Sequence, residues 1–525
     1  MRKITFFVLL LFLKFVYSQE TIGLVYNNVN EDKSEGYTLF KPSVDNRVFL
    51  INNCGETVNQ WDFSGDNSIN AYFLENGNLL QSSGTYAEIR DWNNNIIWSI
   101  SYSTLGFSIH HDIAPLPNGN FLVLVKDVYS KVEMLAQGID PSFSDDTLAL
   151  EKILEIEPIG IDSANIVWEW KIFDHLIQEY DSSKLNYGIV ANNSQLLDFN
   201  YGDISNLIHA NAINYNEDLD QILFSARNLN EVYIIDHSTT TEEAATHSGG
   251  VYGKGGDILW RWGNPEVYDN GTIVDRKLSG QHDVKWITDG PHQGKISVFN
   301  NVGYGNDFTA SSVHIIDQND TNGVYALNSG RFLPESYFWS WDGTIMDTVM
   351  HGEKKCGVQI MSNGNALINE SVKGRITEVD NLGNVIWVYI IPVSDGINFN
   401  QFSQPAINES FRAYRYPEGY SGFDNVVFNN TGIIEDVNSI SQECINLLSV
   451  DDSYFTSLNV YPNPTKDVLN FDVHVDFIEV YDLYGKKILS QTNSENINLE
   501  NLPDGLYIIK LLNNDRSEFF KISKT

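Results

Sequence analysis

Residues 76–98, NGNLLQSSGTYAEIRDWNNNIIW, contain both ends of a unit that recurs along the chain. The unit opens with Asn-Gly-Asn and an apolar pair, and it closes with a polar turn and a strand that ends in Trp98. Because Asn-Gly suits the positive-φ positions of a tight hairpin turn, the apolar residues that follow are predicted to form a strand. The segment therefore predicts short antiparallel strands.

Both ends of this unit recur. Asn-Gly-Asn returns at 118–120 and 363–365, and the closing turn returns at 380–387 as DNLGNVIW. Six strand endings carry a tryptophan: Trp61, Trp98, Trp168, Trp260, Trp339 and Trp387. Repeats of short strands at such periods are typical of propeller blades, although two stacked sandwiches are the alternative. We predict an all-β fold, a six-bladed β-propeller, with blades at about 37–62, 71–100, 109–170, 209–262, 282–341 and 358–390.

Composition and the N-terminus indicate the compartment. The formal net charge of −36 over 525 residues repels nucleic acid and anionic lipid, so neither is an expected partner. Arg2 and Lys3 precede an apolar run at 4–16, which indicates a signal peptide over 1–18 that is too short to span a membrane. No other segment is long and apolar enough to span one, so we expect a secreted or cell-surface protein without a transmembrane segment.

Only three cysteines are present, Cys54, Cys356 and Cys444, so the chain is not a disulfide scaffold. No Cys-x-x-Cys or Cys/His zinc pattern, phosphate loop or dinucleotide fingerprint occurs. We therefore expect no cofactor and no structural metal.

The pattern changes towards the C-terminus. After the expected propeller domain at 19–430, residues 431–457 are polar and are interpreted as a linker, and 458–525 contain short alternating strands typical of a small β-sandwich. This last segment opens with Tyr-Pro-Asn-Pro and later carries Asp-Leu-Tyr-Gly-Lys and Pro-Asp-Gly-Leu-Tyr. It resembles the type A C-terminal sorting domain of the type IX secretion system. The resemblance implies recognition by that machinery, transport across an outer membrane and later removal of the domain.

Histidines mark the start of three neighbouring blades. His111, beside His110, opens the third blade, His209 the fourth and His282 the fifth. First strands of a blade line the central channel, so these side chains are predicted to converge although they are far apart in sequence. Aligning His111-Asp112 with His282-Asp283 favours His111 over His110 as the inward residue.

Two further residues complete the candidate site. Asn211 is two residues from His209 and shares its face of the strand, and Arg227 ends the next strand. A guanidinium fork suits a sulfate or phosphate group, so the set predicts a site for a tetrahedral anion. Structural histidines and a three-histidine zinc site are the alternatives, and Arg227 disfavours a cation. Of the other histidines, His175 is expected at the surface.

Five segments, in order along residues 40–400, resemble the bacterial arylsulfate sulfotransferase family: His110-His111-Asp112 with 117–120, His209-Ala210-Asn211, Ser225-Ala226-Arg227, 260–263 and Gln281-His282. The family consists of six-bladed propellers that move a sulfuryl group from an aryl sulfate ester to a phenolic acceptor without a nucleotide donor. The resemblance implies that His282 is the nucleophile and forms a sulfohistidine, that His209, Asn211 and Arg227 hold the sulfate oxygens, and that His110 or His111 completes the pocket. A non-catalytic surface propeller that binds glycans or proteins is the alternative function.

Overall fold

The computed structural model describes residues 21–28, 33–63, 70–303, 309–401, 403, 405, 407–435, 460–482, 486–513 and 516–525. The expected signal peptide at 1–18 and most of the expected linker at 431–457 lie outside these residues. The chain divides into two compact units, residues 1–440 and 441–525.

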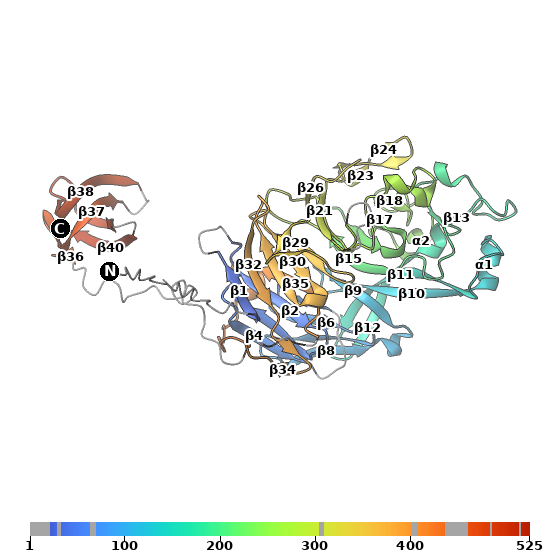
Figure 1. The fold of residues 1–525 in the computed structure, drawn as a ribbon, viewed down its shortest axis with the longest axis horizontal. Helices are drawn as coiled ribbons and strands as arrows, with labels where there is room; N and C mark the ends of the chain where they lie inside the picture. The colour runs from blue at the N-terminus through green and yellow to red at the C-terminus, as the bar shows by residue number, and fades with distance from the viewer. Residues whose placement is uncertain are drawn as a thin grey trace, which may run out of the picture. The chain divides into compact units, whose positions relative to one another are not determined.

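The first unit is built from antiparallel sheets that follow one another along the chain (Figure 1). Within its described residues, six sheets contain four or five strands. From the inner strand outward, the first three are β35 (Ser410–Tyr416), β2 (Tyr37–Pro42), β3 (Arg47–Ile51), β4 (Thr57–Asp62); β5 (Asn70–Phe73), β6 (Leu79–Ser82), β7 (Tyr86–Arg90), β8 (Ile96–Ser101); and β9 (Ile109–Pro115), β10 (Phe121–Ser130), β11 (Thr147–Ile159), β12 (Ser163–Lys171). The other three are β15 (Ala210–Asn216), β16 (Gln221–Ala226), β17 (Glu231–Asp236), β18 (Ile258–Trp262); β19 (His282–Trp286), β20 (Ile296–Asn300), β21 (Ser312–Ile316), β26 (Trp339–Trp341); and β29 (Gly357–Ile360), β30 (Ala366–Glu370), β31 (Arg375–Val379), β32 (Val385–Ile390), β1 (Gly23–Asn27).

These sheets form a closed ring. Neighbouring sheets meet along the inner strands, from β5 to β9, β15, β19, β29 and β35, and the first sheet meets the second again through β2 and β5. Two segments close the ring: β35, late in the chain, is the inner strand of the first sheet, and β1 is the outer strand of the sixth. In Figure 1 the blue β1 and β2 accordingly lie beside the orange β32 and β35. The fold is therefore the predicted six-bladed β-propeller.

A tryptophan near the end of each blade joins it to the next blade. The indole N–H donates in each case to a backbone carbonyl of the following blade. The pairs are Trp61 to Asp91 at 2.9 Å, Trp98 to Ser163 at 2.8 Å, Trp168 to Thr239 at 3.0 Å, Trp260 to Leu333 at 2.8 Å, Trp341 to Gly383 at 3.1 Å and Trp387 to Asn53 at 2.8 Å. The repeated tryptophan is thus a contact between blades as well as a core side chain.

In the fifth blade this contact uses Trp341, whereas the sequence pattern points to Trp339. Both indoles are half-buried against the same core. The strands β10 and β11 extend far beyond the rest of the third blade, because they pair continuously from Phe121–Ile156 to Ser130–Thr147. The helix α1 (Lys131–Gln137) follows β10 directly.

The second unit is described by β36 (Val460–Tyr461), β37 (Val468–Tyr481), β38 (Lys487–Asn498), β39 (Gly505–Asn513) and β40 (Arg516–Lys524). The long strand β37 pairs with β36 and β38 in its first half and with β38 and β39 in its second half. A break in the β37–β38 register between Asn470 and Val475 bends the sheet around a core that includes Leu469, Val480 and Ile509. A small unit of β-strands was expected in this part of the chain, and the described residues form one.

Candidate active site

The inner strands of the third, fourth and fifth blades are irregular at their beginnings. In β15, Ala210 pairs with Ala226 and Ile213 with Phe224, so two residues of β15 lie opposite a single residue of β16. The strand β19 has the same bulge between His282 and Lys285, and β9 has a larger one between Ile109 and Ile113. Bulges re-aim side chains, and here each bulge lies beside or contains a predicted site residue.

Positive φ angles accompany these bulges. The angle is 59° at His111, 48° at His209 and 55° at Asp283. Residues other than glycine adopt this conformation at a cost of roughly 1–3 kcal/mol, and such residues gather at functional sites. The bulges also correct the expected alignment of His111 with His282. His282, Ala210 and Ile109 are the last paired residues before the bulges of β19, β15 and β9. The bulge of β9 contains three residues and the other two contain two, so His111 lies within its bulge while His282 precedes its own.

The histidines of the third and fourth blades lie together. The rings of His111 and His209 are 4.9 Å apart between centroids, and those of His110 and His111 are 5.0 Å apart. The His110 Nε2 atom lies 2.8 Å from a carboxylate oxygen of Glu151, so this ring is held towards β11. His111 therefore approaches His209, whereas His110 is fixed behind it through an Nδ1–Nδ1 contact of 2.7 Å.

His282 lies deepest, with 3% of its surface exposed. Its Nδ1 atom is 2.7 Å from the Asn301 Oδ1 atom and 3.0 Å from the Gly280 carbonyl, and both oxygens are acceptors. The Asn301 amide is oriented by donating to the Gly352 carbonyl at 2.8 Å. The proton of His282 must therefore reside on Nδ1, which leaves a lone pair on Nε2. The backbone N–H of Lys355 donates to that lone pair at 3.2 Å.

Arg227 contributes a charge that no carboxylate of the described residues neutralises. Its guanidinium is half-buried and donates to Asn228 at 3.0 Å, and among the described residues it forms no ion pair. Arginines elsewhere do pair with carboxylates, namely Arg47, Arg90, Arg261, Arg331, Arg375, Arg412 and Arg415. An unpaired, partly desolvated guanidinium is suited to binding an anion.

Asn211 is fully buried and faces the neighbouring blade. Its Nδ2 atom donates to the Gln281 carbonyl at 2.8 Å, and its Oδ1 atom has no hydrogen-bond partner in the part of the chain that the structure describes. The amide thus holds the residue just before His282, and one of its two N–H groups remains for another acceptor.

A buried ionic cluster on the inner strands surrounds these residues. Arg412 on β35 lies 2.8 Å from the Asp283 carboxylate through Nε, and Lys285 lies 2.8 Å from the same oxygen. Asp112 accepts hydrogen bonds from Asn70 and from Tyr72, the latter at 2.7 Å. The sequence analysis missed Arg412 because its strand follows the last repeat. One signal was available: the first predicted blade, 37–62, is one strand short of four.

Burial and positive neighbours keep the three site histidines neutral. Burial, then the charges of His110, His209, His282 and Arg412, lower the pKa of His111 to about 2. Burial and then Arg412 lower the pKa of His282 to about 3, and burial and then Arg227 lower that of His209 to about 4. The positive charges of two guanidinium groups beside these rings favour an anion and disfavour the zinc alternative.

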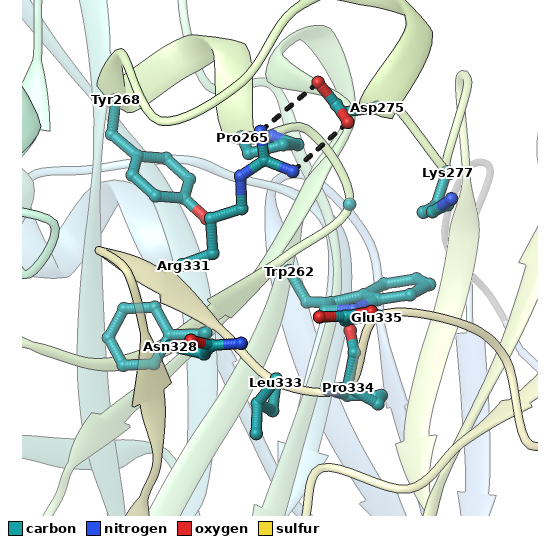
Figure 2. A pocket seen from close by; sticks show the side chains of 12 residues that line it. Trp262, Pro265, Tyr268, Asp275, Lys277, Asn328, Arg331, Leu333, Pro334 and Glu335 are labelled. Atoms are coloured by element: carbon teal, nitrogen blue, oxygen red, sulfur yellow. Dashed lines mark hydrogen bonds and ion pairs between the residues drawn. The ribbon is translucent and has the colours of Figure 1, made fainter.

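Figure 2 shows a separate pocket of about 280 Å³ that none of the predicted site residues lines. Its guanidinium, from Arg331, is paired with the Asp275 carboxylate at 3.1 Å. Trp262 and Lys277 also line it. Arg331 therefore differs from Arg227 in having its charge neutralised.

The expectation for His175 is wrong. This ring is fully buried and hydrogen-bonded to Asp257, because the segment after β12 folds back as a 3-10 helix, Ile172–His175.

The fold and the site define a closed β-propeller with neutral histidines at the start of its inner strands and, after β16, an arginine that forms no ion pair with the described residues. The family model described as arylsulfotransferase (ASST) matches residues 71–391. This match covers more than half of the chain, and the chain belongs to the arylsulfotransferase family. Family membership supports an arylsulfotransferase type of function.

The second unit matches another family model, the secretion system C-terminal sorting domain, over residues 459–524. This domain supports export by type IX secretion to the cell surface or beyond. Among the described residues, no helix has both the length and the apolar character needed to cross a membrane.

No curated protein sequence matches the chain. Solved structures similar to it include a protein of unknown function from Bacteroides caccae, at 13% identity and a TM-score of 0.37, covering 68% of this chain and 94% of that one. Another is a putative 6-phosphogluconolactonase from Bacteroides fragilis, at 10% identity and a TM-score of 0.36, covering 73% of this chain and 98% of that one. The fold assignment rests on the six sheets and their closure.

Proposed function

We propose that the propeller transfers a sulfuryl group from an aryl sulfate ester to a phenolic acceptor through a sulfohistidine at His282. The observation that carries this proposal is the combination of the buried His282 imidazole, with its lone pair on Nε2, and the nearby Arg227 guanidinium, which has no carboxylate partner among the described residues. A neutral imidazole is a nucleophile, and a guanidinium fork matches the oxygens of a sulfate ester. No nucleotide and no other cofactor is required.

In the first step, the Nε2 lone pair of His282 attacks sulfur, the bond between sulfur and the ester oxygen breaks, and a phenolate leaves. Arg227 and His209 bind the sulfuryl oxygens and the developing negative charge. The backbone N–H of Lys355, which donates to Nε2 at 3.2 Å in the free protein, can turn to a sulfuryl oxygen once Nε2 is bonded to sulfur.

In the second step, the acceptor phenol gives its proton to a neutral histidine and its oxygen attacks sulfur. The bond between sulfur and Nε2 breaks, and His282 returns to its Nδ1-protonated form. His209 suits the role of base better than His111, because both are half-buried but the pKa of His209 is lowered less, to about 4. The first phenolate takes up a proton from water after it leaves, and the protonated base releases the acceptor's proton to water, so the protons balance over the cycle.

The remaining predicted residues have supporting roles in this scheme. Asn211 holds the Gln281 carbonyl and offers its second N–H to a sulfuryl oxygen. His111 completes the pocket, and His110 orients it from behind, since His110 is fixed by Glu151.

Export is the second part of the proposal. Residues 1–18 act as a signal peptide, 19–430 form the catalytic domain, 431–457 the linker, and 458–525 the type IX sorting domain that is removed after transport. Deleting 458–525 is expected to block surface delivery and leave transfer intact. Equal secretion of the truncated and full-length chains would contradict this assignment.

A two-substrate assay tests the transfer. Purified protein is incubated with an aryl sulfate whose phenol is coloured, with and without a second phenol. We expect release of the coloured phenol, formation of the second sulfate ester and ping-pong kinetics. Binding of sugars without any transfer would favour the non-catalytic alternative instead.

A further inference from the structure

A second cluster of titratable side chains lies outside the propeller channel. His175 ends the 3-10 helix that follows β12, while His247 and Asp257 belong to the connection between α2 (Thr241–Ala244) and β18. Their side chains bring together two segments that are about seventy residues apart in sequence, and none of them takes part in the transfer proposed above.

Two imidazoles converge on one carboxylate oxygen. The Nδ1 atoms of His175 and His247 lie 2.8 Å and 2.6 Å from the Asp257 Oδ1 atom. All three possible ligand atoms lie within 4.8 Å of one another. Imidazole nitrogens with a carboxylate form a ligand set that divalent transition metals, zinc among them, prefer.

The other nitrogen of His175 decides which atom is free to bind. Its Nε2 atom is 2.8 Å from the Ala244 carbonyl, which can only accept a hydrogen bond. Nε2 therefore carries a proton, and in the neutral ring the lone pair is on Nδ1, facing Asp257. Metal-binding histidines commonly donate their second N–H to a backbone carbonyl in this way.

The buried part of the cluster is rigid. The His175 ring is fully buried and stacks on Trp170, with centroids 5.8 Å apart and planes at 8°, and the Trp170 indole donates to the Gly256 carbonyl at 2.7 Å. A Cβ atom on Gly256 would lie 2.5 Å from the His175 Nε2 atom, so only glycine fits there. His175 and Asp257 are thus held in place before any ion binds.

We propose that His175 Nδ1, His247 Nδ1 and Asp257 Oδ1 bind one divalent transition metal ion of the zinc class. Ligand atoms around tetrahedral zinc lie about 3.3 Å apart, given bonds of about 2.0–2.1 Å. The cluster must therefore widen slightly, and His247, whose side chain is 61% exposed, is free to swing outward. A pocket of about 410 Å³ is lined by His247, although not by the other two residues, and the fourth position of the ion would be left to water.

The bound ion would join the segment after blade three to the connection that leads into the last strand of blade four. Because a metal that binds only the folded chain adds to its stability, chelation should lower the melting temperature. Without a metal, His175 needs a second proton to donate to Asp257, so an imidazolium–carboxylate pair is the competing account.

The test uses the purified full-length protein equilibrated with zinc chloride and passed through a desalting column. We expect about one zinc per chain by elemental analysis and a lower melting temperature in EDTA. His247→Ala removes an exposed ring without touching the core and is expected to weaken zinc binding more than tenfold and to abolish the effect of EDTA. His292→Ala, on a turn far along the chain, is the control and should behave as the parent protein.

Absence of zinc above background, with equal melting temperatures in zinc and EDTA, would overturn the proposal in favour of the ion pair. Zinc retained in full by His247→Ala would also overturn it, because the ion would then lie elsewhere. Sulfuryl transfer is measured on the same samples, and it should be the same with and without zinc, so the two proposals fail independently.

Discussion

The outer and inner edges of the blades follow opposite rules. At the outer edge, a tryptophan near the end of every blade donates to a carbonyl of the next blade, and the same contact recurs six times in the described chain. At the inner edge, three blades begin with bulges and positive φ angles at His111, His209 and Asp283. Regular contacts close the ring, while the irregular strand starts hold the residues of the proposed active site.

The comparison indicates that backbone strain is tolerated at the inner edge. The outer tryptophans fix each blade against its neighbour, so the inner strands need not be uniform. Two carboxylates join inner strands of neighbouring blades. Asp112 accepts a hydrogen bond from the Ile213 N–H at 3.3 Å, and Asp283 accepts one from the Val358 N–H at 2.9 Å. Substitutions at the inner edge should therefore change activity more than stability, and those at the outer edge should do the reverse.

The largest effect is expected for His282→Gln. Glutamine keeps a polar group near Asn301 but has no nucleophilic nitrogen, so the transfer rate should fall by more than about 10⁴-fold. Steady-state assays with saturating donor measure this. Retention of a tenth of the parent rate would exclude His282 as the covalent residue.

The next effect is expected for Arg227→Lys. An ammonium keeps the charge but cannot reproduce the planar fork, so the rate should fall by roughly 10²–10³-fold. Arg331→Lys is the matched control. Arg331 is paired with Asp275 in the pocket that Figure 2 shows, so this substitution should leave the rate unchanged. Equal losses in the two variants would refute a specific role for Arg227.

The pH dependence of stability should be intermediate in size. The folded pKa of His282 is about 3, below the roughly 6.5 of an unfolded histidine, so the unfolded chain takes up the proton first as the pH falls. The neutral His282 ring therefore contributes to the free energy of unfolding in full above about pH 6.5. As the pH falls towards 3 this contribution is lost, by up to about 1.4 kcal/mol per pH unit. Denaturant unfolding at pH 7 and pH 5 should show a smaller loss for His282→Gln than for the parent. Identical losses would show that His282 does not titrate in this way.

The smallest effect is expected for Trp61→Phe at the outer edge. Phenylalanine loses the hydrogen bond to the Asp91 carbonyl and some buried volume, which should lower the free energy of unfolding by about 1–3 kcal/mol. The transfer rate at 25 °C should not change. A large loss of rate without a loss of stability would mean that the two edges are not separable.

Much of the fold could be predicted from the sequence, because its signals are local. Asn-Gly-Asn turns and tryptophan strands mark blade positions without any knowledge of distant contacts, and the structure agrees with all six predicted blades. The two strands that close the ring, β1 and β35, were not predicted, because they lack those turns. They pair with segments far away in the sequence, Trp387–Ile390 and Tyr37–Pro42.

That the candidate residues lie near one another could be predicted, but their arrangement could not. Histidines at blade starts indicated a shared channel, and the structure brings His111, His209 and Arg227 towards His282. The bulges could not be foreseen, since they depend on how each inner strand pairs with the next one. Arg412 and the Lys355 N–H, which set the charge and the hydrogen bonding of His282, come from segments after the last recognisable signals of their blades.

Mass spectrometry of the protein quenched after mixing with an aryl sulfate alone tests the central claim most directly. Without an acceptor, the sulfuryl group should remain on the protein, and peptide mapping under non-acidic conditions should locate one adduct on His282. The adduct should be absent in His282→Gln and disappear when a phenol is added before the quench. An adduct only on another residue, or full transfer activity in His282→Gln, would contradict the account.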